Sequence, residues 1–235
     1  MLPFSTDLKD TDFLAGSLLM VDKPQGWTSF DVVNKIRGLL RKKFNTKNIK
    51  VGHSGTLDPM ATGLLLICTG KWTKELQQLT GLDKKYQGHI MLGIETATYD
   101  AEGEIISTLP VPDISKNDID EMLKKFIGEI DQYPPAYSAI KKDGKKLYEL
   151  ARAGKEVVLE ARKVKVYGIQ LLEFNSPILE ILLHCGSGFY VRSLAHDLGK
   201  VIGCGAHLSS LRRTAIGDYS IEDAFAVEQI ENILG

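Results

Sequence analysis

The chain has 235 residues, and its 29 lysine and arginine residues nearly balance 30 aspartate and glutamate residues, for a net charge of −1. That length suits one large domain or two small ones, and no apolar run approaches the ~18 residues that a membrane-spanning helix needs. The N-terminus lacks a basic region followed by an apolar run, so it does not read as a secretion signal. Three well-separated cysteines show neither a disulfide framework nor a metal-binding spacing, and we expect buried thiols at Cys68, Cys185 and Cys204. These features predict a cytoplasmic protein with no membrane segment.

The first third of the chain predicts a strand, a helix and a second strand. Residues 17–21 form an apolar run that predicts a buried strand, ended by a turn at Pro24 and Gly26. Thr28 or Ser29 then caps a helix that runs to about Arg41. Its expected apolar face consists of Phe30, Val33, Ile36 and Leu40. The hydrophobic run 64–67 predicts the second strand, and a helix is expected around 74–79.

The rest of the chain mixes strands and helices without regular βαβ alternation. Residues 86–96 and the pair 163–174 and 178–185 predict strands, the pair being antiparallel. Residues 117–127 and 191–202 predict helices; the first is stopped by Gly128 and turns Ile119, Met122, Leu123 and Phe126 inward. A turn at 142–145 precedes a short helix at 147–153, and segments 208–216 and 221–234 close the chain. We therefore predict an α+β fold with a mixed, mainly antiparallel central sheet flanked by helices and loops, in a single domain over residues 1–235.

The charges are segregated along the sequence. No acid lies between Asp31 and Asp58, whereas that window holds seven basic residues: Lys35, Arg37, Arg41, Lys42, Lys43, Lys47 and Lys50. Further basic groups lie at 141–146 and 162–165, and after Arg213 the chain carries acids but no bases. Such a chain can present a positive face to a nucleic acid, although each cluster on its own is equally consistent with ordinary solvated surface.

The segment 50–63, KVGHSGTLDPMATG, presents one carboxylate, Asp58, among glycines and small polar residues directly before a buried run. Glycine permits close backbone approach, and the proline after the acid stiffens the turn. Taken alone, an Asp-Pro pair is more often a turn former than a catalytic group. The pattern therefore makes Asp58 a candidate without naming a reaction.

Other kinds of site find little support. His53 beside Ser54 does not form the G-x-S-x-G turn of a hydrolase, and the five histidines show no metal-ligand spacing. No phosphate-binding or dinucleotide-binding glycine loop is present, so we expect no metal and no cofactor.

Two further regions carry candidate binding residues. Tyr190 and Arg192 stand where a glycine-rich turn enters a helix, and they could stack on a base and hold a carboxylate; a core tyrosine with a surface arginine is the alternative. Residues 84–86 and 211–213 are expected to form RNA-facing edges, or else plain surface.

Several of these segments together resemble the TruB family of tRNA pseudouridine synthases. The resemblance rests on several segments: 18–24 with Gly26 and 28–29, 51–63, 85–86, 92–93, 137–141 with 144–152, 188–199 and 205–214. These motifs follow the family order over residues 17–217, and the segment around Asp58 is the most specific of them.

The resemblance implies that the chain isomerises the uridine at tRNA position 55, in the T loop, to pseudouridine. It makes Asp58 the essential carboxylate, with Tyr86 stacking on the flipped base and Arg192 pairing with Asp58. Tyr190 and Leu211 would then shape the uracil pocket, and His53 would fill the space that the extruded bases leave. For RNA binding we expect contributions from Arg41, Lys42, Lys43 and Lys141. The expected partner is the T arm of tRNA, with no protein partner, and the enzyme is expected to be a monomer.

The chain departs from the family pattern at a few positions. Phe189 and Ala97 stand where the family often has polar residues, and Gly186-Ser187 replaces a Ser-Lys pair. Longer relatives carry a C-terminal RNA-binding PUA domain, for which residues 1–235 leave no room. An RNA-folding module without turnover and a hydrolase using Asp58 are the competing hypotheses. The intact Asp58, Tyr86 and Arg192 favour the synthase over the RNA-folding module, and the hydrolase lacks a recognisable general base for water. The missing appended domain disfavours the relatives that use guide RNAs.

Overall fold

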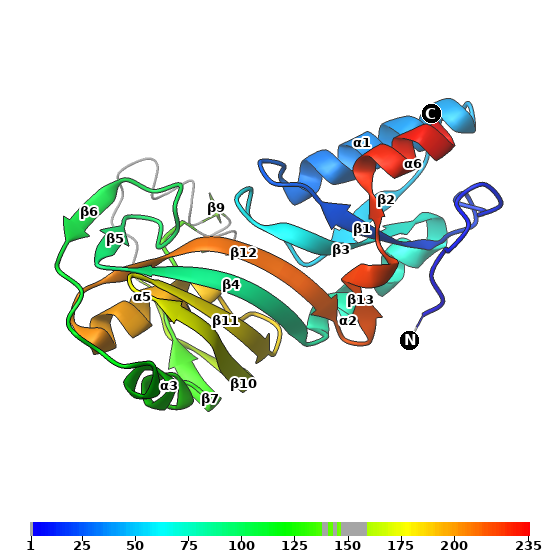
Figure 1. Ribbon diagram of the computed structural model, residues 1–235. Helices are drawn as coiled ribbons and strands as arrows, with labels where there is room; N and C mark the ends of the chain where they lie inside the picture. The colour runs from blue at the N-terminus through cyan, green and yellow to red at the C-terminus, as the bar shows by residue number, and fades with distance from the viewer. Residues whose placement is uncertain (1, 138–140, 143–144, 147–158) are drawn as a thin grey trace. The chain divides into compact units, whose positions relative to one another are not determined.

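The computed structural model describes residues 2–137, 141–142, 145–146 and 159–235. The chain forms two compact units: unit 1 comprises Met1–Tyr86 and Leu211–Gly235, and unit 2 comprises Gln87–Ser210 (Figure 1). Two strands, β4 (Lys84–Leu92) and β12 (Ala206–Ile216), have residues in both units.

Unit 1 is built on strands in the order β14-β1-β3-β12, with β2 pairing β3 and β13 pairing β12. The strands are β1 (Leu18–Lys23), β2 (Val51–Ser54), β3 (Thr62–Thr69), β13 (Tyr219–Ser220) and β14 (Phe225–Ala226). The helices are α1 (Ser29–Lys43), η1 (Gly70–Glu75), α2 (Leu76–Gly81), η2 (Ile221–Asp223) and α6 (Val227–Leu234). Pairing is antiparallel for β1–β3 and β2–β3 and parallel for β1–β14 and β3–β12.

The central strands of unit 1 are buried on both faces. Because successive side chains of a strand point to opposite faces, β1 and β3 each contribute to two cores. Leu19 and Leu65 pack with α1 and α6, which lie side by side. Leu18 and Leu64 pack on the other face with Leu79 of α2 and with residues near β13. This double burial explains why residues 64–67 read as a continuous apolar run rather than an alternating one.

Helix α1 begins where the sequence predicts it, at a cap formed by Thr28. The Thr28 hydroxyl accepts from the Asp31 backbone N–H at 3.0 Å, and the Asp31 carboxylate accepts from the Thr28 N–H at 2.8 Å. One prediction for this helix is wrong: Phe30 is exposed, and Val32 and Leu39 are buried in its place. Phe30 falls outside the stripe that the buried positions trace at helical spacing, and its ring lies 6.0 Å from the Arg37 guanidinium.

Unit 2 is built on strands in the order β12-β4-β11-β10-β7, and two short pairs, β5-β6 and β8-β9, stand apart from that sheet. The elements are β5 (Ile94–Thr96), β6 (Ile105–Thr108), α3 (Lys116–Lys124), β7 (Gly128–Gln132), β8 (Lys141–Lys142), β9 (Lys145–Lys146), β10 (Arg162–Asn175), β11 (Ile178–Cys185) and α5 (Val191–Ile202). The two units together confirm the predicted α+β class, with a mixed and mostly antiparallel sheet.

The hairpin of β10 and β11 and the helix at 191–202 confirm the sequence predictions. The predicted strand at 86–96 is interrupted at Gly93, whose φ of +82° takes the chain out of β4 and into β5. Helix α3 ends at Lys124, before the predicted stop at Gly128, and only Ile119 and Leu123 of its predicted inward face are fully buried. The predicted turn at 142–145 lies between β8 and β9, but its residues 143–144 and the predicted helix 147–153 lie outside the described residues.

All three cysteines are buried and free, as predicted. Burial raises the pKa of the Cys68 thiol to about 12, with a smaller contribution from the charge of Glu75, which makes this thiol unreactive at neutral pH. In the part of the chain that the structure describes, no helix is long and apolar enough to cross a membrane.

Candidate active site

Asp58 lies on the connection between β2 and β3, two antiparallel strands of unit 1 paired from Val51–Thr69 to Ser54–Leu66. Its side chain is partly exposed, whereas its neighbour Leu57 is buried. The Asp58 carbonyl accepts from the Ala61 N–H at 3.1 Å, which closes a tight turn around Pro59. Asp58 thus lies on a short, hydrogen-bonded loop, and the residue is not fully buried.

The end of β1, the β1–α1 connection and the start of α1 fix this loop in place. The Ser29 hydroxyl accepts from the Leu57 N–H at 2.8 Å and donates to the Leu57 carbonyl at 3.2 Å. The Pro59 carbonyl accepts from the Gly26 N–H at 2.8 Å and from the buried Lys23 ammonium at 3.4 Å. Two sequence motifs that lie about thirty residues apart therefore form one structural unit around Asp58.

The loop ends at Gly63, where only glycine fits. Its φ is +104°, and a Cβ there would lie 2.3 Å from the Arg213 carbonyl oxygen of the neighbouring strand β12. Such a distance is far inside van der Waals contact, so any side chain would push β3 and β12 apart.

Arg213 connects the Asp58 loop to Tyr86. Its Nε donates to the Leu64 carbonyl at 2.7 Å, its Nη2 donates to the Gly55 carbonyl at 3.0 Å, and its guanidinium also hydrogen-bonds the Tyr86 side chain. Only 1% of Arg213 is exposed. Burial lowers the pKa of Arg213, and the neighbouring Tyr86 opposes that shift. The sequence had suggested no catalytic or positioning role for this residue.

Two residues of the predicted RNA-facing edges are in fact buried. Arg213 holds the loop as described, and Lys84 is 6% exposed, with its ammonium donating to the Thr80 carbonyl at 2.6 Å. Arg212 forms a two-pronged ion pair with Asp22, at 2.6 Å and 3.1 Å. The expectation that these side chains face RNA is therefore wrong for Lys84 and Arg213. Lysine and arginine are usually exposed, so the sequence predicts surface positions for them. Burial of these two side chains depends on backbone carbonyl acceptors that only the structure shows.

His53 and Leu211 join the same region of unit 1. Burial, and to a lesser extent the charge of Arg213, lowers the pKa of His53, so its ring is neutral at pH 7. Its Nδ1 is buried and has no hydrogen-bond partner among the described residues. Leu211 is half-buried and lies two residues before Arg213 in β12, so both project from the same face of the strand. Unit 1 thus supplies Asp58, His53, Tyr86 and Leu211.

The remaining two candidate site residues lie at the start of α5 in unit 2. The Gln132 side chain holds the backbone of Tyr190 from both sides: its Oε1 accepts from the Tyr190 N–H at 2.8 Å and its Nε2 donates to the Tyr190 carbonyl at 3.0 Å. This contact fixes the entry into the helix and leaves the tyrosine ring half-buried.

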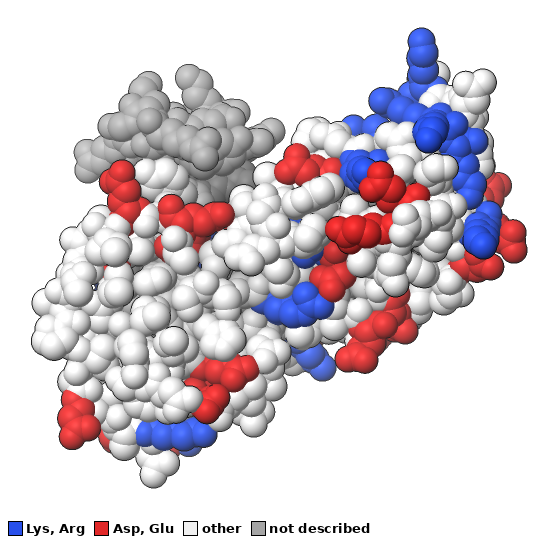
Figure 2. Space-filling view, turned by 45° about the horizontal axis from the view of Figure 1, so that its top comes forward, with Lys and Arg blue, Asp and Glu red and all other residues white. Residues whose placement is uncertain are grey.

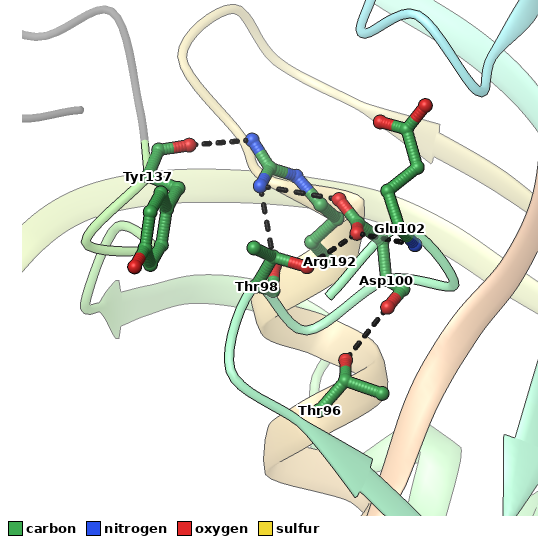
Figure 3. Close-up of polar contacts among 6 residues, drawn as sticks. All are labelled: Thr96, Thr98, Asp100, Glu102, Tyr137 and Arg192. Atoms are coloured by element: carbon green, nitrogen blue, oxygen red, sulfur yellow. Dashed lines mark hydrogen bonds and ion pairs between the residues drawn. The ribbon is translucent and has the colours of Figure 1, made fainter. Parts of the chain in front are cut away.

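Arg192 is buried in a polar network that sequence reasoning did not identify (Figure 3). Its guanidinium lies 3.3 Å from the Asp100 carboxylate and donates to the carbonyls of Thr98, at 3.2 Å, and Tyr137, at 3.0 Å. Asp100 also accepts from the Glu102 N–H at 3.1 Å and from the Thr98 hydroxyl. The alternative of a surface arginine is wrong, whereas the pairing of Arg192 with Asp58 stays a prediction.

The loop that carries Asp100 is also attached to α5 by an aromatic stack. The Tyr99 ring lies 3.7 Å from the His196 ring at an interplanar angle of 12°, and Tyr99 itself has a φ of +63°. Burial, reinforced by the charge of Lys200, lowers the pKa of His196 to about 4, so the stacked imidazole is neutral at pH 7. The backbone of Leu208 in β12 bonds both Tyr99 and Ala101, at 3.0 Å and 3.1 Å.

The predicted RNA-binding residues of α1 are exposed. Arg41, Lys42 and Lys43 form its last turn, and Figure 2 shows lysine and arginine side chains gathered at the upper right, over the part of unit 1 where α1 lies. Lys141 lies in β8, for which the structure describes the backbone alone. Among the described residues, no three His, Cys, Asp or Glu side chains gather in a way that could hold a metal ion, and the expectation of a metal-free site stays a prediction.

Comparison with known families agrees with this geometry. A family model described as "TruB family pseudouridylate synthase (N terminal domain)" matches residues 41–191, and one described as "tRNA pseudouridylate synthase B C-terminal domain" matches residues 192–235.

Curated relatives match nearly the whole chain. A protein of Flavobacterium johnsoniae named tRNA pseudouridine synthase B is 47% identical over 224 residues, which cover 95% of this chain and 98% of the relative. A protein of Opitutus terrae with the same name is 49% identical over 214 residues, covering 91% of this chain and 86% of the relative.

Among solved structures, a chain of a Cbf5-Nop10-Gar1 complex superposes with a TM-score of 0.69 at 29% identity and covers 96% of this chain. A chain of an H/ACA RNP bound to a substrate RNA containing 2'-deoxyuridine gives a TM-score of 0.65 at 28% identity and covers 92% of this chain. This chain spans only 57% and 52% of those two solved chains. With the family models and the curated relatives in agreement, the chain belongs to the TruB family of pseudouridylate synthases.

Proposed function

We propose that this protein is a tRNA pseudouridine synthase that isomerises the uridine at position 55, in the T loop, and that Asp58 is its essential carboxylate. The observation that carries the proposal is the Asp58 loop itself, a partly exposed acid held between Ser29, Gly26 and Arg213. The names of two bacterial relatives, which this chain matches over most of their length, support tRNA as the substrate.

The reaction requires a uridine that has left its stack. The bond between uracil N1 and ribose C1′ is inaccessible inside a stacked loop, so the nucleotide must flip out, which costs a few kcal/mol. Stacking on an aromatic ring returns about 1–3 kcal/mol. Tyr86 is suited to that stacking role because Arg213 holds its side chain against the Asp58 loop.

Asp58 then acts on the flipped nucleotide. A carboxylate can attack uracil C6, attack ribose C1′, or help to remove the proton from C2′, and all three routes release the N1–C1′ bond. The uracil rotates, C5 bonds to C1′, C5 loses its proton and N1 gains one, so substrate and product are isomers. We propose that Tyr190 and Leu211 shape the uracil pocket, that His53 fills the space left by extruded bases, and that Arg192 keeps Asp58 ionised.

Arg41, Lys42, Lys43 and Lys141 would contact backbone phosphates. These contacts would increase the affinity for tRNA and position it on the enzyme, without recognising its base sequence. The proposed partner is tRNA, recognised at its T arm, and the enzyme would act in the cytoplasm as a monomeric catalytic domain without a protein partner. Neutral His53 suits a wedge among bases, because an uncharged ring loses little by leaving water.

The test is to incubate Asp58→Asn with an unmodified tRNA transcript and map pseudouridine by position. We expect loss of turnover by at least a thousandfold, with tRNA affinity within a fewfold of the unsubstituted protein, because asparagine keeps the shape of the side chain but cannot act as a nucleophile or base. Asp218→Asn, an exposed acid in the turn before β13, is the matched control and should leave the rate unchanged. Pseudouridine formed at a normal rate by Asp58→Asn, or at a position other than 55 by the unsubstituted protein, would overturn the proposal.

A further inference from the structure

Unit 1 contains a pocket that the proposed reaction does not use. It has a volume of about 380 Å³ and is lined by residues of three segments: Leu14, residues 48–50, and residues 70, 71, 73 and 74. Three of its lining residues are lysines, namely Lys50, Lys71 and Lys74, and all three are exposed. The lining also includes Asn48 and Thr73, and it includes no acidic and no aromatic side chain.

The lysines of this pocket have no acidic partner within ion-pair distance in the part of the chain that the structure describes. By contrast, Lys35 pairs with Glu231 and Lys124 pairs with Asp120 at 3.0 Å, so lysines of this chain do take acidic partners where these are near. Three uncompensated ammonium groups around one hollow attract a polyanion.

Backbone hydrogen bonds connect the segments that line the pocket. The Gly70 N–H donates to the Lys50 carbonyl at 3.0 Å, and the Lys71 N–H donates to the Ala15 carbonyl at 3.2 Å. Gly70 has a φ of +52°, and a Cβ there would lie 2.6 Å from the Leu14 carbonyl oxygen. The absent side chain lets residues 14–16 pack directly against η1, and this packing holds the lysine-bearing segments together.

The pocket and Asp58 lie at opposite ends of the same hairpin. Strand β3 runs from Thr62, beside the Asp58 loop, to Thr69, beside Gly70, and strand β2 begins directly after Lys50. Seven steps of about 3.3 Å place the pocket roughly 23 Å from the Asp58 end of β3. If an RNA places one nucleotide at Asp58, the part of its backbone that reaches the pocket is therefore distant from that nucleotide.

We propose that this pocket, which we call the lysine pocket, binds backbone phosphates of the tRNA outside the T arm. The ligand class follows from the lining: ammonium groups and an amide recognise phosphate oxygens, whereas base stacking needs an aromatic face that the lining does not offer. Lys47 and the last turn of α1 lie in the same acid-free part of the sequence and extend the basic character toward Arg41. The inference rests on the proposed function, because it assigns a second contact to the same substrate.

The experiment compares two substrates, a full unmodified tRNA transcript and a hairpin made of its T arm alone, and one triple variant, Lys50→Gln, Lys71→Gln and Lys74→Gln. With full tRNA we expect kcat/KM to fall about tenfold through KM, and the slope of log affinity against log salt concentration to shrink by about 2–3, near 0.9 for each lost phosphate contact. With the hairpin we expect kcat/KM within twofold of the unsubstituted protein, because that RNA ends before it reaches the pocket.

The matched control is Lys116→Gln, Lys124→Gln and Lys125→Gln, which removes the same charge from exposed positions of unit 2. It should leave both substrates and the salt slope nearly unchanged. An equal loss on both substrates, or no loss on full tRNA, would overturn the lysine pocket as a second contact. If the unsubstituted protein forms no pseudouridine in either RNA, the proposed function itself fails, so the two failures are distinguishable.

Discussion

At the scale of single residues, Arg213 has the largest consequence for the site. A buried guanidinium is costly to desolvate, and the structure compensates it with two backbone carbonyls and the Tyr86 side chain. These contacts join the Asp58 loop, the start of β3 and the start of β4. One side chain thus sets the position of the candidate nucleophile relative to the candidate stacking ring.

We expect Arg213→Lys to lower the free energy of unfolding by about 2–4 kcal/mol. An ammonium group cannot donate in the fixed directions of a planar guanidinium, so buried carbonyls would lose their hydrogen-bond donor. The same change should lower kcat at least tenfold with a smaller effect on KM, since Tyr86 and Gly55 lose their fixed spacing. Urea unfolding and single-turnover kinetics on tRNA measure the two effects.

Arg212→Lys is the control for this prediction, because its partner Asp22 and its own side chain are both partly exposed. Partly exposed ion pairs contribute at most about 1 kcal/mol, so stability and rate should stay close to those of the unsubstituted protein. Equal effects of the two substitutions would show that Arg213 has no special positioning role.

At the scale of elements, the site depends on how the start of α1 meets the β2–β3 connection. Thr28 caps the helix, and the next residue, Ser29, reaches across to Leu57, directly before Asp58. Ser29 is 1% exposed, so its two hydrogen bonds are made without competition from water. The helix cap at Thr28 and the Ser29–Leu57 hydrogen bonds come from adjacent residues but stabilise different parts of the structure. Separate substitutions can therefore distinguish their effects.

Ser29→Ala should lower kcat several-fold and destabilise the protein by about 1–3 kcal/mol, because the buried Leu57 N–H loses its acceptor and the loop loosens. Thr28→Ala should cost about 1 kcal/mol through the lost cap, with little effect on kcat once the protein is folded. Chemical denaturation and steady-state kinetics on both variants check the distinction. A greater loss of kcat in Thr28→Ala than in Ser29→Ala would contradict it.

At the scale of the whole molecule, charge distribution matters more than the net charge of −1. Residues 32–57 contain no acid, while residues 214–235 contain no base. Basic side chains gather over the region of α1 (Figure 2), so a nearly neutral protein can still attract a polyanion to one face.

Replacing Arg41, Lys42 and Lys43 by glutamine should weaken tRNA binding. The slope of log affinity against log salt concentration should fall in magnitude by up to about 2–3, because a protein with fewer phosphate contacts releases fewer counterions on binding. Unlike the lysine-pocket variant, this one should affect a T-arm hairpin as well if the end of α1 contacts the T arm. Filter binding over a range of salt concentrations measures the slope, and an unchanged slope would remove the end of α1 from the RNA footprint.

Much of the fold could be predicted because it depends on local pattern. The Thr28 cap, the β10–β11 hairpin and helix α5 follow from capping chemistry, strand alternation and helical spacing. The wrong predictions concern features that depend on tertiary neighbours. Phe30 is hydrophobic, but its position around the axis of α1 faces away from the core. Gly93 interrupts a stretch that the sequence pattern predicts to be one strand.

The sequence by itself determined the fold class, the candidate carboxylate Asp58 and the family. A specific motif of consecutive residues can be recognised without knowledge of the structure. Tertiary structure alone decided that Arg213 and Lys84 are interior, that Arg192 contacts Asp100, and that three lysines from two segments line one pocket. The physical reason is that burial and charge compensation depend on groups distant in sequence, here up to 158 residues apart for Arg213 and Gly55.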